Sequence, residues 1–501
     1  MGILMRAEAF KHKGRALPAR SWVYPLLILL VWLASRWWAL SRGAVCFQAS
    51  GIFYGCQVLD LGLLKNNLIE SIFYLHCQPP LFNILLGLGL KLFGSGFIFG
   101  FQVLYLLFGL ALGQSLFQVL ARLRIPPGLA FLLTIVFLLS PGCVLFENYL
   151  FYTYPITLLL ILSALGLHRL VIRKDFASGL IFFSLLAALV LIRNVFHLAW
   201  FLLVLILVLF FSRVPRRRVL AAAFLPLLLL CSLYLKNLLV FGYPAASTSL
   251  GMSLYHVAAG HISETDRQEL AGKFSPEDAV LVRLPPEPTM KPFRAYKDKI
   301  RLPEHLDIPV LADPDKADGN LNGNYVGYLA VGKRLTRISL RLIGHRPAAY
   351  LKSLGRAWLS YFQPAHSYFK DQFEEGVFLV PGSPSTWYHI YDDLLLGRDL
   401  EFPGCPWFGG PGQARLPLVI LLPLLFGYGV WASFRRQRHY DPAEKLVILY
   451  VCACIANVSL VANLFSMGEN MRHRFVLEPF FLLLLGLLLR DLGALMRRKG
   501  R

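Results

Sequence analysis

The sequence is short of charged residues. Asp, Glu, Lys and Arg together make up 16% of its 501 residues, whereas an ordinary soluble domain has about 25%. Hydrophobic residues make up 56%, so a soluble chain of this composition would have too little polar surface to cover itself. The shortage of charge excludes a soluble globular protein and indicates that much of the surface faces lipid.

Several catalytic and cofactor-binding motifs are missing as well. The sequence contains no GxxxxGK[ST] phosphate-binding loop, no HExxH zinc motif and no GxSxG nucleophile motif. No cysteine and histidine spacing typical of a zinc site is present either. We therefore expect neither a bound metal ion nor another cofactor.

Long apolar runs are what the sequence does contain. A helix needs about 20 mostly apolar residues to cross a bilayer, and the runs predict about ten such helices, with a range of about 9–12. We place them at 22–40, 97–119, 127–141, 154–171, 178–194, 196–212, 218–240, 416–434, 446–465 and 475–490. Residues 79–94 are apolar but short and begin with two prolines, so we expect an interfacial helix there. The predicted fold class is an all-α polytopic membrane protein.

Positive charge indicates the orientation of these helices. The net charge is +21, and with both termini inside, the inside loops read ARLR, HRLVIRK, RVPRRR, RRQRHYDPAEK and RDLGALMRRKGR. Lys and Arg collect on the cytoplasmic side of membrane proteins. We therefore expect both termini to be cytoplasmic. The only N-x-S triplet, 457–459, lies inside a predicted span and no retention tail is seen, which favours a bacterial inner membrane. Because the basic residues are spread over short loops, we expect no nucleic-acid partner.

Three regions follow from this topology. Residues 1–240 form an N-terminal transmembrane module with a first outer loop at 41–96, which we expect to be catalytic. Residues 241–415 form a large extracytoplasmic loop domain, with surface-lying helices near 338–362. Residues 416–501 hold the C-terminal transmembrane helices.

Acidic residues on the outer side are candidates for a general base. Asp60 and Glu70 lie in the first outer loop, and Glu147 lies in the short second outer loop. A carboxylate held near the membrane could take a proton from an acceptor hydroxyl. The plainer alternatives are a helix N-cap for Asp60 and a surface carboxylate for Glu147, which has no adjacent basic residue in the sequence.

Basic residues on the outer side break the inside-positive trend. Arg193 and Lys236 end two predicted spans on that side, and Glu469, Arg472, His473 and Arg474 precede the last span. A planar guanidinium matches phosphate oxygens. The outer face therefore offers both carboxylates and cations, as the transfer of a group from a lipid phosphate requires.

Residues 74–94, YLHCQPPLFNILLGLGLKLFG, carry a family resemblance. The segment resembles the HPPL…LLLxLxLKLFG segment of polyprenyl-phosphate-sugar-dependent glycosyltransferases of the GT-C fold, which include the protein O-mannosyltransferases and the lipid A aminoarabinose transferases. The order of other features is similar, from Asp60 before the segment to an E…R…EP element near the last span. The resemblance covers about the first 200 and the last 40 residues, and His76 stands two positions away from the family's histidine.

The resemblance implies a GT-C-like fold and an inverting glycosyltransferase. Its donor would be a sugar on undecaprenyl or dolichyl phosphate, bound from membrane lipid, and its acceptor a hydroxyl of a lipid, glycan or protein. The implied base is Asp60, with Glu70 in reserve and Glu147 as a further acid. The implied phosphate ligands are Arg193, Lys236, Arg472 and Arg474, and the implied substrate contacts are His76, Gln78, His473 and Glu469. The family includes metal-dependent members, so a divalent metal stays an option, although none of the motifs named above supports it.

Two other functions fit a multi-span protein with a large outer loop. A transporter or flippase of a lipid-linked or anionic substrate would more often carry charges or broken helices in mid-membrane. An O-antigen polymerase or ligase would use a lipid diphosphate donor and rely on arginines, with less need for acidic loops.

Overall fold

The computed structural model describes residues 22–42, 45–287, 307–369, 391, 394–397, 399–402, 412–435 and 440–499. These residues are almost entirely helical. The exception is a two-stranded antiparallel hairpin of β1 (Asp399–Phe402) and β2 (Gly412–Arg415), in which Asp399 pairs with Arg415. An all-α polytopic membrane protein is therefore confirmed as the fold class.

Seven helical segments are long and apolar enough to cross a membrane. They are α1 (Val23–Ser41), the joined pair α5 (Leu81–Phe93) and α6 (Phe97–Arg122), α9 (Thr153–Arg173), α12 (Arg216–Phe241), α21 (Leu416–Phe434), α22 (Pro442–Phe465) and α24 (Glu478–Lys499). The bent pair α7 (Pro127–Leu138) and α8 (Pro141–Glu147) would make an eighth span. Two further apolar helices, α10 (Phe176–Ile192) and α11 (Leu198–Phe211), are shorter.

Each predicted span thus coincides with an apolar helix, but the count of ten stays a prediction. By length and composition, the described residues support seven spans, or eight with the bent pair. The predicted interfacial helix is α5, which a short 3-10 turn, η2 (Gly94–Gly96), joins to α6. Gly94 has a φ of 54°, a left-handed conformation in which glycine avoids the clash of a Cβ atom.

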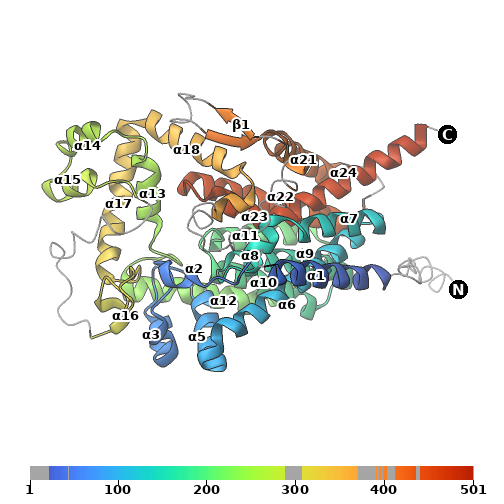
Figure 1. Ribbon diagram of the computed structural model, residues 1–501, viewed down its shortest axis with the longest axis horizontal. Coiled ribbons are helices and arrows are strands. Elements are labelled where there is room, and N and C mark those ends of the chain that lie inside the picture. The colour runs from blue at the N-terminus through green and yellow to red at the C-terminus, as the bar shows by residue number, and fades with distance from the viewer. Residues whose placement is uncertain are drawn as a thin grey trace.

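The spanning helices lie roughly along the long axis of the molecule (Figure 1). Helix α1 begins, and α24 ends, toward the same end of the molecule, whereas α13 to α17 lie at the opposite end (Figure 1). This arrangement agrees with termini on one face and a large loop on the other. Which face is cytoplasmic stays a prediction, and the basic N-terminal segment 6–20 lies outside the described residues.

The loops at the outer end fold into short helices. In the first outer loop these are α2 (Ser50–Tyr54), α3 (Leu61–Asn66) and α4 (Leu68–Phe73). The large loop contains α13 (Leu250–Ala259), α14 (Glu264–Ala271), α15 (Pro276–Arg283), α16 (Pro309–Ala312), α17 (Val326–His345), α18 (Pro347–Tyr361) and the 3-10 helix η4 (Ala365–Phe369). Helices α13 to α15 and α17 enclose a small apolar core of their own. The helices predicted near 338–362 are the end of α17 and α18, which begins at Pro347, a residue type favoured in the first turn of a helix.

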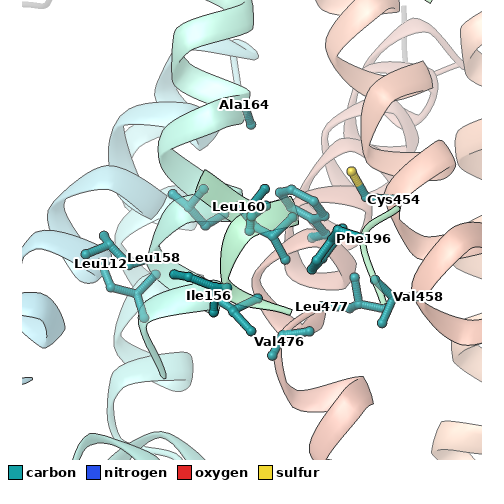
Figure 2. Close-up of a cluster of buried hydrophobic side chains, with 14 of the residues drawn as sticks. Leu112, Ile156, Leu158, Leu160, Ala164, Phe196, Cys454, Val458, Val476 and Leu477 are labelled. Atoms are coloured by element: carbon teal, nitrogen blue, oxygen red, sulfur yellow. The ribbon is translucent and has the colours of Figure 1, made fainter. Parts of the chain in front are cut away.

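Three elements of the membrane region meet directly beneath the outer end. Figure 2 shows Ile156 and Leu160 of α9 on one side of Phe196 and Val458 of α22 on the other, with Ala164 further along α9. Phe196 and Leu160 are fully buried. This apolar layer forms the floor on which the candidate site rests.

One buried ion pair joins the first span to the bent pair. Arg36 of α1 donates from Nε to Glu147 Oε2 at 2.6 Å and from Nη1 to the Leu138 carbonyl at 2.7 Å, and Trp32 Nε1 donates to Glu147 Oε1 at 3.1 Å. The two charged side chains are 4% and 0% exposed. A Cβ atom on Gly109 of α6 would lie 1.9 Å from Glu147 Oε1, so only glycine leaves room for the pair.

We predict that Arg36→Leu destabilises the protein by about 3–5 kcal/mol, because the change leaves Glu147 buried without a partner. Adding Glu147→Gln should recover part of that loss, since the uncompensated charge is removed. The free energy of unfolding in mixed micelles measures both effects. Arg42→Leu, at the exposed end of α1, is the matched control and should change little. Equal stability of Arg36→Leu and the wild type would contradict the assignment.

Candidate anion-binding site

A small cleft opens where four elements converge at the outer end of the helices. They are the start of α9, the linker between α10 and α11, the middle of α22, and α23 (Asn470–Phe475). The residues that line the cleft are Tyr152, Thr153, Ile156, Arg193, Val195, Phe196, Val458, Arg472, His473 and Val476. The cleft thus has an apolar floor, part of it drawn in Figure 2, and a polar wall.

Two guanidinium groups share one aromatic ring in this wall. The central carbon of Arg193 lies 4.4 Å from the centroid of the Tyr152 ring, and that of Arg472 lies 5.7 Å from the same centroid. Arg472 also lies 5.2 Å from the Phe151 ring and 5.1 Å from the Tyr368 ring. The electron-rich faces of these rings stabilise the neighbouring cations.

The charges of the two arginines are balanced unequally. Arg472 pairs with Glu469 in an ion pair. Among the described residues, Arg193 has no carboxylate within 4 Å and no side-chain hydrogen bond. Burial, with Arg472 beside it, lowers the pKa of Arg193 to about 9, so its guanidinium is still charged at neutral pH. The wall therefore carries one uncompensated positive charge and favours an anion.

His473 lies in the same wall as a neutral donor. Burial lowers the pKa of His473 well below its ordinary value, and the charges of Arg193 and Arg472 add to that effect. A neutral imidazole can still donate one hydrogen bond. Arg193, Arg472 and His473 all line the cleft, and their predicted roles in binding phosphate and substrate stay predictions.

The other two predicted phosphate ligands lie elsewhere. Lys236 donates from Nζ to the Leu75 carbonyl at 2.8 Å. Arg474 pairs with Glu478 at 3.2 Å and donates to the Gln363 carbonyl at 2.9 Å. Lys236 and Arg474 are not among the residues that line the cleft. For Arg474 the reason is helix geometry, because residues two apart on a helix, such as 472 and 474, point to different sides. The role of Lys236 and Arg474 in phosphate binding stays a prediction that their placement does not support.

The three predicted acids have quite different surroundings. Asp60 caps α3 by accepting from the backbone N–H groups of Gly62 and Leu63, and its other oxygen accepts from Ala317 at 3.0 Å. The helix N-cap is therefore confirmed as one role of Asp60. Glu70 is exposed in the first turn of α4. The catalytic roles of both residues stay predictions.

Glu147 requires a correction. The expected alternative was a surface carboxylate without a basic partner, and that expectation is wrong: the side chain is buried and paired with Arg36. Glu147 is thus withdrawn from solvent and from an incoming acceptor. Among the acids named from the sequence, Glu469 is the one in contact with an arginine of the cleft.

His76 is also held by structural contacts. Its Nδ1 is 2.8 Å from Thr248 Oγ1 and its Nε2 is 2.9 Å from the Asn324 carbonyl. The side chain is fully buried, and burial lowers its pKa to about 3. His76 therefore connects the first outer loop to the large loop, and its predicted contact with substrate has no support from this placement.

Gln78 lines a second small hollow beside the cleft. Tyr152 lines both. The residues around this second hollow are Gln57, Gln78, Pro79, Phe82, Asn83, Tyr152 and Ile192. The predicted role of Gln78 in contacting substrate is compatible with this location.

Sequence reasoning missed several residues that build the site. Arg36 stands within the first predicted span, and a charge there is expensive enough to be a signal by itself. Lys316 in the large loop donates from Nζ to the carbonyls of Phe53 and Gly55. Tyr152 and Tyr368 could not be singled out among the many aromatic residues of the sequence, because only their contacts with Arg193 and Arg472 distinguish them.

The large loop contains one Asp-x-Asp triplet, Asp313, Pro314 and Asp315, which counts against the expectation that no motif supports a metal. Within the described part of the chain, no group of three His, Cys, Asp or Glu residues is arranged to hold a metal ion.

No protein-family model matches this chain, and no curated protein matches it. The family resemblance therefore enters below only as a proposal.

We predict that acid destabilises the protein through its buried histidines. His76 and His473 have folded-state pKa values below those of the unfolded chain, so the unfolded state binds more protons as the pH falls below about 6.5. Each group should then remove about 1.4 kcal/mol of stability per pH unit. Unfolding measured between pH 7 and pH 4.5 should show a shallower slope for His76→Gln. The exposed His345→Gln variant is the control, and an unchanged slope in His76→Gln would contradict the assignment.

Proposed function

We propose that this protein is a membrane glycosyltransferase that moves a sugar from a polyprenyl-phosphate donor to an acceptor hydroxyl on the extracytoplasmic face. The observation that carries the proposal is the pair of arginines around Tyr152, in a cleft whose floor is the apolar core of the membrane helices. A lipid phosphate needs both parts: cations for the headgroup and an apolar approach for the chain. The QPPL segment, with its resemblance to such enzymes, supports the same donor.

The proposed reaction is an in-line displacement at the first carbon of the sugar. The acceptor oxygen forms a new bond to that carbon, the bond from carbon to phosphate oxygen breaks, and the polyprenyl phosphate leaves with both electrons. Negative charge then grows on the phosphate oxygens. Arg193 and Arg472 would stabilise this charge, since preorganised cations act most strongly where charge develops.

The acceptor proton must pass to a base. The resemblance assigns that role to Asp60, whose carboxylate is engaged by three backbone N–H groups. Glu469 is the alternative, because it contacts Arg472 and its side chain is 49% exposed. Both acids stay candidates, and their variants separate them.

We expect sugar transfer by the purified protein in lipid nanodiscs, with polyprenyl-monophosphate sugar as donor. Arg193→Gln and Arg472→Gln should each reduce turnover by about 10²–10³-fold, the usual effect of removing one donor to a developing oxyanion. Arg337→Gln, on the exposed side of α17, is the matched control and should retain activity. Activity that survives both cleft variants would overturn the proposed site.

Asp60→Asn and Glu469→Gln identify the base. The variant that removes the base should lower kcat by about 10²–10⁴-fold while donor binding stays unchanged. The other variant should show near-normal kcat. Substrate flux into liposomes without sugar transfer would instead favour a transporter.

A further inference from the structure

Two membrane helices end side by side at the inner end of the molecule, the end toward which α1 begins and α24 ends. Helix α6 ends at Arg122 and α9 ends at Arg173, and the two helices pack against each other. Because both begin at the outer end, they run in the same direction. Their last turns therefore bring charged side chains from two helices to one place.

Three arginines occupy these last turns, and we call them the inner arginine cluster. Arg169 and Arg173 are one turn apart on α9 and therefore share one face of that helix. Arg122 lies within electrostatic range of both. All three residues are exposed, and among the described residues none of them has a carboxylate within 4 Å. Like charges at this spacing repel each other, so the cluster favours an anion.

The acidic residues around the inner arginine cluster are already engaged. Asp441 and Glu444, at the start of α22, both pair with Arg124, at 2.9 Å and 3.1 Å. Asp175 caps α10 by accepting from the Ser178 N–H at 2.7 Å. Asp175 also lies within electrostatic range of the two arginines of α9, but one carboxylate cannot balance three guanidinium groups.

Exposed apolar side chains adjoin the same cluster. Ile172 is 57% exposed and lies on the α9 face that carries Arg169. Phe176, at the start of α10, is 49% exposed. Exposed apolar side chains of membrane helices face lipid chains. An anionic phospholipid therefore matches both the guanidinium groups and the apolar surface beside them, whereas a free phosphate ion matches only the first.

We propose that the inner arginine cluster binds the phosphate group of an anionic phospholipid, whose acyl chains run past Ile172 and Phe176. Guanidinium groups match phosphate oxygens. Basic pockets between membrane helices on the cytoplasmic side, the predicted position of this end, hold such headgroups. The bound phosphate offsets the repulsion among the three arginines and thereby holds the inner ends of α6 and α9 together. This site does not depend on the proposed function.

The test measures the first lipid to bind, by native mass spectrometry, with dioleoyl phosphatidylglycerol and dioleoyl phosphatidylcholine as probes. The wild type should bind phosphatidylglycerol more tightly. Arg122→Gln and Arg169→Gln should each weaken that binding by about fivefold, as expected for one basic residue at a lipid headgroup, and leave phosphatidylcholine binding unchanged. Arg213→Gln removes the same charge from an exposed arginine between α11 and α12 at the same end. This matched control should bind both lipids as the wild type does.

Thermal unfolding in nanodiscs separates lipid binding from misfolding of the variants. In phosphatidylcholine, Arg122→Gln and Arg169→Gln should each unfold at or above the Tm of the wild type, because each removes a repelling charge. Adding phosphatidylglycerol should raise the Tm of the wild type more than that of the variant with both substitutions.

Four results would overturn the proposal. They are unchanged phosphatidylglycerol binding in the cluster variants, an equal loss of binding in Arg213→Gln, the same rise in Tm in the wild type and the variant with both substitutions, and a lower Tm of the cluster variants in phosphatidylcholine. The last result would assign these arginines to contacts within the protein.

Discussion

The ion pair between Arg36 and Glu147 is the constraint on which the outer end of the molecule depends. A charge buried among apolar helices is tolerated only when it has a well-placed partner, and the pair also engages Trp32 and the Leu138 carbonyl. It fixes α8, which bends by 60° from α7. The chain that leaves α8 then passes through Tyr149 and Tyr152 to the start of α9. The ion pair thus anchors the helix that leads to Tyr152, whose ring lines both hollows.

Around Tyr152 the structure holds two like charges side by side. Such a pair is stable only with compensation, which the aromatic rings supply to both cations and Glu469 supplies to Arg472. The remaining positive charge belongs to Arg193, at the end of α10. Because the neighbouring surface is apolar, an anion that enters meets little competition from water and interacts strongly with that charge. The site thus offers the two features that a lipid phosphate requires, a positive charge and a neighbouring apolar surface.

Much of this architecture could be predicted from the sequence. Apolar runs located each membrane helix, and basic residues that broke the inside-positive trend included Arg193, Arg472 and His473, which meet in the cleft. Predictions from neighbouring residues in the sequence were wrong where the interacting residues lie far apart in the chain. Glu147 has no basic neighbour along the chain, yet Arg36 reaches it from 111 residues away. Lys236 and Arg474 were expected to bind phosphate, but their side chains contact the Leu75 carbonyl and Glu478 instead of lining the cleft.

The proposed function requires that Arg193 and Arg472 together hold a lipid phosphate. The most direct measurement is an electron cryomicroscopy structure of the protein in nanodiscs with undecaprenyl phosphate. We expect phosphate density between the two guanidinium groups, beside Tyr152, with the lipid chain leaving over the apolar floor. Phosphate density bound at Lys236 or Arg474, with the cleft unchanged, would contradict it.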